Sequence, residues 1–238
     1  LCTAASAAVV DGSQVLVISD RFSDESHAPI PMLLAVSTMH SHLIREGLRM
    51  RASIVAEAGD ARDVHHFAAL IGFGASAICP YLAFETLGGM VTAGDFDGQA
   101  LDEVIANYRK AADAGILKVM SKMGISAVSS YHGAQIFEVL GLSDEVLHRC
   151  FTTTRSRIGG IGFRHIAADV IERHTQAYSA EKLERGGWYK FRRDGDYHAN
   201  TPQVWRALHK TVQGGGRDEY QAYRDLVHSR PPTALRDL

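Results

Sequence analysis

Short apolar runs alternate with amphipathic stretches over the first third of the chain. Apolar runs at residues 15–19, 54–56 and 77–79 are bounded by turn residues or proline and predict strands, the first of them buried on both faces. Residues 31–47 and 60–74 carry apolar positions at three- and four-residue spacing, which predicts a helix after each of the first two strands. This alternation of strand and helix indicates right-handed crossovers and a parallel sheet.

The middle of the chain ends in a concentration of polar side chains. Residues 86–99 are rich in glycine and polar groups and predict a surface loop, and a helix is expected over residues 101–114. An amphipathic helix that ends in two lysines then runs into a short apolar strand, whose exit loop carries several polar groups. Such groups at the C-terminal end of a strand are where α/β enzymes place their chemistry. The candidate site residues of this region are Lys118, Ser121, Lys122, Ser130, Tyr131 and Gln135.

The pattern becomes mostly helical after Leu142. Helices are expected at residues 144–150, 164–178, 202–212 and 218–228. An alternating segment at 188–198, centred on Asp-Gly, predicts a small β-hairpin, and the glycine-rich residues 157–163 predict an interdomain turn. We therefore expect an α/β body over residues 1–142 and a mainly helical extension with a small hairpin over residues 143–238.

Composition excludes several classes of protein. The chain is 46% hydrophobic and 22% charged, which is typical of globular proteins, and its formal net charge of -2 gives no reason to expect a nucleic-acid partner. No apolar run approaches the ~18–20 residues that span a membrane, and we expect no signal peptide, because the first residues lack a basic region followed by an apolar run. Cys2, Cys79 and Cys150 lie far apart, which predicts reduced thiols in a cytoplasmic protein without a metal site of its own. Because the chain opens without methionine and stops abruptly, we expect a fragment of a longer protein.

The histidines and glycines that suggest a ligand site have simpler interpretations. The pair His40 and His42 is two residues apart on a predicted helix and the pair His65 and His66 is adjacent, whereas chelation needs a spacing of three or four. We therefore expect packing or surface histidines. The glycines at 72–74 follow a helix and precede a strand, which is the reverse of a dinucleotide-binding motif and predicts a helix end.

Two carboxylates are expected to share one rim of the sheet. Asp20 follows the first strand and Glu57 ends the second, so the pair would suit acid–base work. The alternative, which we favour, is structural: capping helix N-termini or neutralising Arg62, as Asp60 is expected to cap the helix that follows it. No nucleophile elbow (GxSxG) accompanies them. Lys118 and Lys122 share a helix face, where either a bound anion or plain solvation would explain them.

Blocks of sequence spread over most of the chain match the pattern of one known family. They are residues 18–21, 27–31, 33–36, 42–49, 57–67, 72–75, 80–85, 107–111, 117–126, 129–142, 151–152, 156–158, 160–162 and 192–198. In this order they resemble the central domain of the glutamate synthase large subunit. So many blocks in sequence do not arise by chance.

The resemblance implies a connector rather than a catalytic domain. It places the chain between a glutaminase domain, which releases ammonia from glutamine, and a downstream domain with FMN and an iron–sulfur cluster, which makes L-glutamate from 2-oxoglutarate. The segment itself would hold no catalytic residue, cofactor or metal. The candidate residues named above become interdomain or conduit residues beside the ammonia route. Expected partners are the glutaminase and FMN domains of the same polypeptide and an electron-donating small subunit or ferredoxin, with no nucleic acid and no membrane.

The resemblance also extends to the late strands of FMN-dependent (β/α)8 enzymes, over residues 46–64 and 72–75. There the loop after a strand grips the flavin phosphate, but here Glu57 and Asp60 stand in that loop and would repel the phosphate. We therefore expect a partial or degenerate (β/α) barrel-like body, with parallel strands in βα units, that has lost its flavin.

Two other functions remain open at this point. An autonomous barrel-type lyase or hydrolase would use Asp20 and Glu57 in a polar pocket. A partner-docking module would use the C-terminal helices, with Trp188, Tyr189 and Trp205 as anchors.

Overall fold

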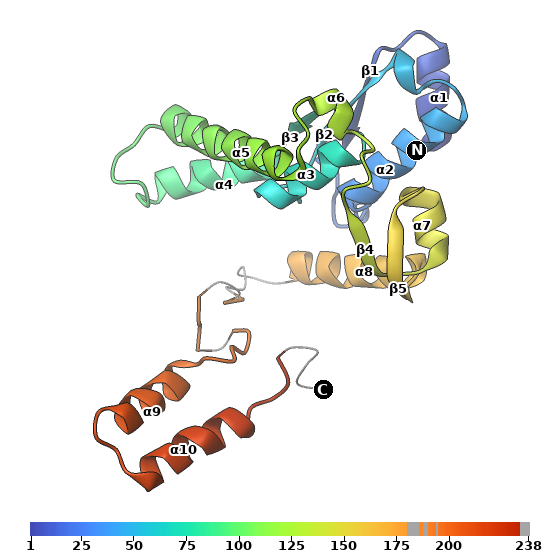
Figure 1. Cartoon of the computed structure of the whole chain (residues 1–238). Coiled ribbons are helices and arrows are strands. Elements are labelled where there is room, and N and C mark those ends of the chain that lie inside the picture. The colour runs from blue at the N-terminus through green and yellow to red at the C-terminus, as the bar shows by residue number, and fades with distance from the viewer. Residues whose placement is uncertain (180–185, 188–189, 194, 234–238) are drawn as a thin grey trace. The chain divides into compact units, whose positions relative to one another are not determined.

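The computed structural model describes residues 1–179, 186–187, 190–193 and 195–233 (Figure 1). The chain divides into two compact units, Leu1–Ser179 and Ala180–Leu238, which are taken one at a time below and called the first and second units.

The first unit begins with the predicted alternation of strands and helices. Its elements are α1 (Cys2–Val10), β1 (Val15–Ser19), α2 (Met32–Arg45), the short 3-10 helix η1 (Arg49–Arg51), β2 (Ser53–Glu57), α3 (Val64–Gly72) and β3 (Ala77–Cys79). The three strands form a parallel sheet in the order β1-β2-β3. The predicted strands, the two helices between them and the parallel sheet are therefore confirmed, whereas α1 was not predicted.

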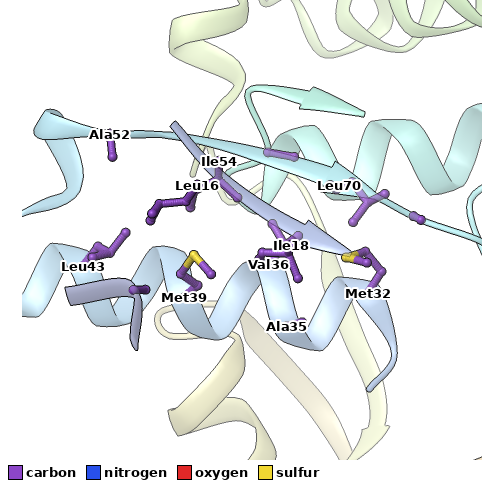
Figure 2. Close-up of a cluster of buried hydrophobic side chains, with 14 of the residues drawn as sticks. Leu16, Ile18, Met32, Ala35, Val36, Met39, Leu43, Ala52, Ile54 and Leu70 are labelled. Carbon is purple, nitrogen blue, oxygen red and sulfur yellow. The ribbon is translucent and has the colours of Figure 1, made fainter. Parts of the chain in front are cut away.

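The hydrophobic core of this unit lies between α2 and one face of the sheet (Figure 2). Val36 and Leu43 of α2 and Ile54 of β2 are completely buried there. On the opposite face, Val15 and Val17 of β1 are 58% and 62% exposed, so the prediction of a strand buried on both faces is wrong. The strands follow one another across the sheet in one direction, and right-handed crossovers therefore place α2 and α3 on the same face.

Arg49 holds three segments together at the N-terminal edge of the sheet. Its Nε donates to His40 Nδ1 on α2 at 2.8 Å. Its Nη1 and Nη2 donate to the carbonyls of Ala52 and Gly74 at 2.7 and 2.9 Å, at the entry to β2 and in the turn before β3. Gly74 has φ +113° and lies against the His40 ring so closely that a Cβ atom there would collide with it.

Two helices, α4 (Tyr81–Thr92) and α5 (Leu101–Met123), pack against each other after β3 (Figure 1). The predicted surface loop over 86–99 is thus wrong over its first half, because glycines within α4 do not break a helix that packs on a neighbour. The predicted helix over 101–114 continues to Met123 and ends at Gly124, which has the left-handed conformation typical of a helix end. The apolar strand expected after the lysines is also wrong: residues 125–127 form no strand and α6 (Val128–Tyr131) follows.

A second, two-stranded sheet completes the first unit. Its parallel strands β4 (Glu138–Leu142) and β5 (Arg155–Ile161) are joined by α7 (Asp144–Cys150), and α8 (Phe163–Ser179) follows. The predicted interdomain turn at 157–163 is wrong, because most of it is β5. A Cβ on Gly160 would collide with the backbone of Gly141, so the glycines here permit close approach of two strands. The predicted boundary between an α/β body at 1–142 and a helical extension at 143–238 falls between β4 and β5, which pair with each other. That division of the chain stays a prediction.

The second unit contains two helices that pack together, α9 (Pro202–Val212) and α10 (Arg217–His228). Thr201 caps α9 by accepting the N–H of Val204. All four predicted C-terminal helices, including α7 and α8, are confirmed. Of the predicted hairpin, residues 190–193 and 195–198 form no strand, while Trp188 and Tyr189 lie outside the described residues. The fold is α/β with parallel strands in two small sheets, and the described residues form no closed barrel, as expected for a partial one.

The contact between Arg49 and His40 predicts a fold that weakens in mild acid. Burial, with the Arg49 charge nearby, lowers the pKa of His40 from 6.5 to about 4. Below pH 6.5 the unfolded chain binds a proton at His40, whereas the folded chain binds one only near pH 4 and below. The contribution of His40 to the free energy of unfolding is therefore complete above pH 6.5 and is lost as the pH falls from 6.5 to about 4. We expect a loss of about 1 kcal/mol in the free energy of unfolding from pH 7 to pH 5, after discounting for the solvent that reaches the ring.

Urea unfolding followed by circular dichroism at the two pH values measures this loss. His40→Asn, which keeps an acceptor for Arg49 but does not titrate, should flatten the pH dependence. His42→Asn is the matched control, because His42 lies on the same helix with a different partner, Ser6 Oγ at 2.8 Å. Equal pH dependence in the wild type and His40→Asn would contradict the assignment.

Candidate functional site

The C-terminal edge of the three-stranded sheet collects most of the charged side chains that the sequence singled out. Ser19 is in register with Glu57, and Glu57 with Cys79, so the residues that follow each strand meet at one edge. Asp20 and Glu57 are therefore brought to the same rim, as the order of the strands predicted. The partners of each carboxylate decide what the pair can do.

Asp20 holds the loop after β2 in place. Its two carboxylate oxygens accept the N–H of Gly59 at 2.9 and 3.0 Å. The Tyr81 hydroxyl lies beside Gly59 and also hydrogen-bonds to Asp20. Burial, and then this hydrogen bond, raise the pKa of Tyr81 to about 12. Asp20 is thus an acceptor shared by a backbone and a side-chain donor.

Glu57 is neutralised by Arg21 from the loop after β1. Arg21 Nη1 lies 3.2 Å from Glu57 Oε1 and Nη2 lies 2.6 Å from Glu85 Oε1. The guanidinium also stacks 4.6 Å from the centre of the Tyr81 ring. The other oxygen of Glu57 accepts from Ser19 Oγ at 2.5 Å. The expectation that these carboxylates neutralise Arg62 is therefore wrong in its partner, because Glu57 pairs with Arg21 instead.

The helix N-termini beside this edge are capped by carboxylates. Asp60 accepts the N–H of Met32 in the first turn of α2 at 3.3 Å, and burial raises the pKa of Asp60. The predicted cap of α3 is wrong by three residues: Asp63 accepts from the N–H groups of His65 and His66. Aspartate is a preferred N-cap residue, and Asp63 directly precedes the first helical residue, Val64, so the sequence contained the signal for this cap.

This edge does not fit a flavin phosphate. A phosphate dianion needs free N–H donors, usually at a helix N-terminus, and a positive field. Here Asp60 takes the N–H of Met32 on α2, Asp63 takes those of His65 and His66 on α3, and Asp20 takes the N–H of Gly59. The positive charge of Arg21 is committed to Glu57 and Glu85. The carboxylates at this edge therefore do not suit a phosphate dianion, and the loss of a flavin site stays a hypothesis.

The six residues proposed from the helix–strand pattern fall into two groups. Five have exposed side chains: Lys118, Ser121 and Lys122 at the end of α5, Ser130 on α6, and Gln135 in the turn after α6, where it has φ +54°. Tyr131 is completely buried, but it and Gln135 lie close together along the chain. These two line one cavity together with residues of α2 and of the loop after α7, which the sequence analysis did not identify.

Three of the four paired histidines have side-chain partners other than a metal ion. His40 Nδ1 accepts from Arg49, His42 Nε2 lies 2.8 Å from Ser6 Oγ, and His66 Nδ1 accepts the N–H of Arg62 at 3.2 Å. Over the part of the chain that the structure describes, no three histidine, cysteine, aspartate or glutamate side chains gather as metal ligands would. None of the described helices has the length and apolarity to cross a membrane.

Comparison with known proteins identifies glutamate synthases as relatives of this chain. The family model described as the glutamate synthase central domain matches residues 1–143. The chain is 46% identical to the ferredoxin-dependent glutamate synthase of Pyropia yezoensis, which it matches over its whole length and over 16% of that protein. It is 45% identical to ferredoxin-dependent glutamate synthase 2, chloroplastic, of Arabidopsis thaliana, with the same coverage.

A bacterial relative is similar to the same degree. The glutamate synthase [NADPH] large chain of Bacillus subtilis (strain 168) is 44% identical over 99% of this chain and 16% of that protein. The chain thus spans about 16% of the length of the curated relatives it matches.

Substitutions at Asp20 separate a structural role from an acid–base role. Asp20→Ala should lower the free energy of unfolding by about 1–3 kcal/mol, because the N–H of Gly59 and the Tyr81 hydroxyl lose their acceptor. Asp20→Asn keeps an acceptor oxygen and should lose less than half of that. Urea unfolding measures both, with Asp24→Ala in the same exposed loop as the control of smaller effect.

The outcome that would contradict the structural role is specific. It is an Asp20→Asn protein that folds with wild-type stability but has lost the turnover of its full-length parent.

Proposed function

Because the chain belongs to the family of glutamate synthase central domains, we propose that it connects the glutaminase domain of a glutamate synthase to the domain that holds FMN and an iron–sulfur cluster. The parent would form L-glutamate from glutamine and 2-oxoglutarate, as a flavin-dependent oxidoreductase. The observation that carries this proposal is the match of the whole chain to a 16% portion of relatives named glutamate synthase. A segment of this size would be only one part of the parent protein.

We assign no catalytic step to the segment itself. At the C-terminal edge of the sheet, both oxygens of Asp20 and both oxygens of Glu57 already accept hydrogen bonds. A general acid or base needs an oxygen free to meet the substrate's proton. The autonomous lyase or hydrolase is therefore the weaker candidate.

The cofactors belong, in this proposal, to the rest of the parent. An iron–sulfur cluster usually takes four thiolates, whereas this chain has three cysteines, all of them free. The reduced state of these thiols suits a reducing compartment such as the cytoplasm, although several relatives carry the name chloroplastic. The electron donor is a partner of the parent, either ferredoxin or an electron-donating small subunit.

We further infer that this segment does not select the electron donor. Relatives named as ferredoxin-dependent and as NADPH enzymes match it at 46% and 44% identity over nearly all of its length. A segment that contacted the donor would differ more between the two groups.

The exposed candidate residues provide the interdomain contact. Lys118 and Lys122 are four residues apart on α5, so they share a face, with Ser121 beside them and Ser130 on α6. Tyr131 does not belong to this contact surface, because it is completely buried. A contact here would let the segment report the state of one catalytic domain to the other.

A partner-docking role for the second unit is a second candidate. Trp205, Leu208 and Val212 of α9 are exposed and recur at three- and four-residue spacing, which gives one apolar stripe on the helix. Of the anchors expected from the sequence, Trp205 remains, while Trp188 and Tyr189 lie outside the described residues. Sizing and cross-linking of the chain with Trp205→Ala test this role.

The first test of the connecting role is the coding sequence on both sides of the chain. We expect an upstream glutaminase domain with an N-terminal cysteine, and a downstream FMN domain with clustered cysteines. Stop codons close to residues 1 and 238 would contradict the proposal.

Charge reversal at the lysine face tests the interdomain contact. In the full-length parent, Lys118→Glu with Lys122→Glu should lower the glutamate formed per glutamine hydrolysed by at least about twofold, because a rim charge pair turns into a repulsion. Lys110→Glu, on an exposed position of the same helix, is the matched control and should leave the ratio unchanged. An unchanged ratio in the double variant would count against the contact.

A further inference from the structure

A cavity of about 240 Å³ lies within the first unit, away from the C-terminal edge of the sheet. Its walls come from α2, the end of α3, the turn after α6 and the loop after α7. The family match assigns no role to it, and the connecting role proposed above does not need it. Three features of its walls bear on what it could bind.

The first feature is a buried hydroxyl that has nothing to bond to. Tyr131 lines the cavity and is completely buried, packed edge-on against Phe137 with ring centres 6.4 Å apart. Its hydroxyl finds no hydrogen-bond partner among the described residues and is closed to a molecule the size of water, so a ligand in the cavity reaches it only after a shift of the side chains that cover it. Leaving a buried polar group unpaired is costly, so such a group calls for a partner from outside the chain. Burial also raises the pKa of Tyr131, which keeps the hydroxyl protonated and able to donate.

The second feature is backbone strain concentrated at the cavity. Three described residues other than glycine have positive φ, and two of them, Gln135 at +54° and Thr153 at +69°, line this cavity. They come from separate segments, the turn after α6 and the loop after α7. Branched or long side chains adopt this conformation at an energetic cost that surrounding structure must offset, and such residues cluster at binding sites.

The third feature is the chemistry of the walls. Neutral donors come from Ser41, Thr154 and the Gln135 amide, and Arg45 brings a positive charge at the exposed end of α2. None of the described side chains that line the cavity is acidic. His40, which also lines it, is uncharged because burial holds its pKa near 4. One cation among neutral donors suits a single negative charge.

The rest of the wall is apolar. Ile44, Phe73, Ile136 and Phe137 line the cavity, and the Phe73 and Phe137 rings stack with their centres 5.5 Å apart. A phosphate or sulfate would gain nothing from these rings, whereas a short hydrocarbon chain would. The volume also sets the size, because a water molecule occupies ~30 Å³ of liquid and drug-sized ligands need ~300 Å³ or more.

We propose that this cavity binds a small organic carboxylate, whose anionic group accepts from the Tyr131 hydroxyl and whose short carbon chain packs on the phenylalanine rings. Arg45 attracts the anion at the mouth. Gln135 and Thr153 are held in their strained conformations so that their side chains complete the site.

Thermal unfolding of the full-length parent with chosen probes tests this site. Acetate, butyrate and succinate are each compared with the neutral amide of the same carbon skeleton at constant ionic strength. Ligands that bind the folded state raise the melting temperature in proportion to their affinity. We expect at least one carboxylate to raise it saturably, and its amide to raise it by less than half as much.

Two variants locate the effect. Tyr131→Phe removes the unpaired hydroxyl, so without ligand it should melt at or above the wild-type temperature, and its affinity for the carboxylate should fall by about three- to tenfold. Arg45→Gln changes an exposed residue and should lower the affinity by a similar factor while leaving the fold intact. Tyr108→Phe is the matched control, because the Tyr108 hydroxyl already donates to the Arg62 carbonyl at 2.9 Å.

Three outcomes would overturn the proposal. They are the absence of saturable binding by all three carboxylates, an equal response to the carboxylates and their amides, and unchanged affinity in both Tyr131→Phe and Arg45→Gln. The second outcome would mean that water or a neutral molecule satisfies Tyr131.

Discussion

Helix α2 packs against the three-stranded sheet and against α7, which joins the two strands of the second sheet, and the arrangement of the first unit depends on it. One of its faces packs Val36 and Leu43 against the inner face of β1 and β2. From another face, Ser37 Oγ donates to the Cys150 carbonyl and Thr38 Oγ1 donates to Cys150 Sγ at 3.1 Å, which ties α7 and its two strands to the same helix. Burial on several sides requires a helix that is apolar or paired nearly all round. A substitution in α2 would therefore disturb two cores at once.

The edge of the sheet shows how an active-site location becomes a structural one. In parallel α/β folds, the carboxyl ends of strands and the helix N-termini beside them supply charge and free N–H groups for ligands. Here carboxylates of the chain itself, Asp20, Asp60 and Asp63, occupy those N–H groups, and Arg21 neutralises Glu57. The same geometry that would bind a phosphate elsewhere is used to fix loops. The edge that carries chemistry in other parallel α/β folds is thus held together here by the chain's own carboxylates.

Local patterns predicted the elements that local forces determine. The three strands of the first sheet and the four C-terminal helices have clear apolar periods, and their prediction was confirmed. The strand β5 was missed because its glycines read as a turn, whereas Gly160 is needed for the close approach to Gly141, nineteen positions earlier in the chain. The exposure of Val15 and Val17 depends on the direction in which strands are added, which no apolar run encodes. At the candidate sites, the rim position of Asp20 and Glu57 followed from strand order, but their partners and the cavity beside Tyr131 depend on contacts between distant segments.

The fit of His40 against Gly74 has a consequence for how such sequences can diverge. A side chain at position 74 would occupy the space of the imidazole, so it requires a smaller residue at position 40. A smaller residue without an acceptor atom would in turn leave Arg49 Nε unpaired and loosen the hold of Arg49 on the carbonyls at 52 and 74. Substitutions at positions 40, 49 and 74 therefore depend on one another, and a change at one of them alone would make the protein less stable.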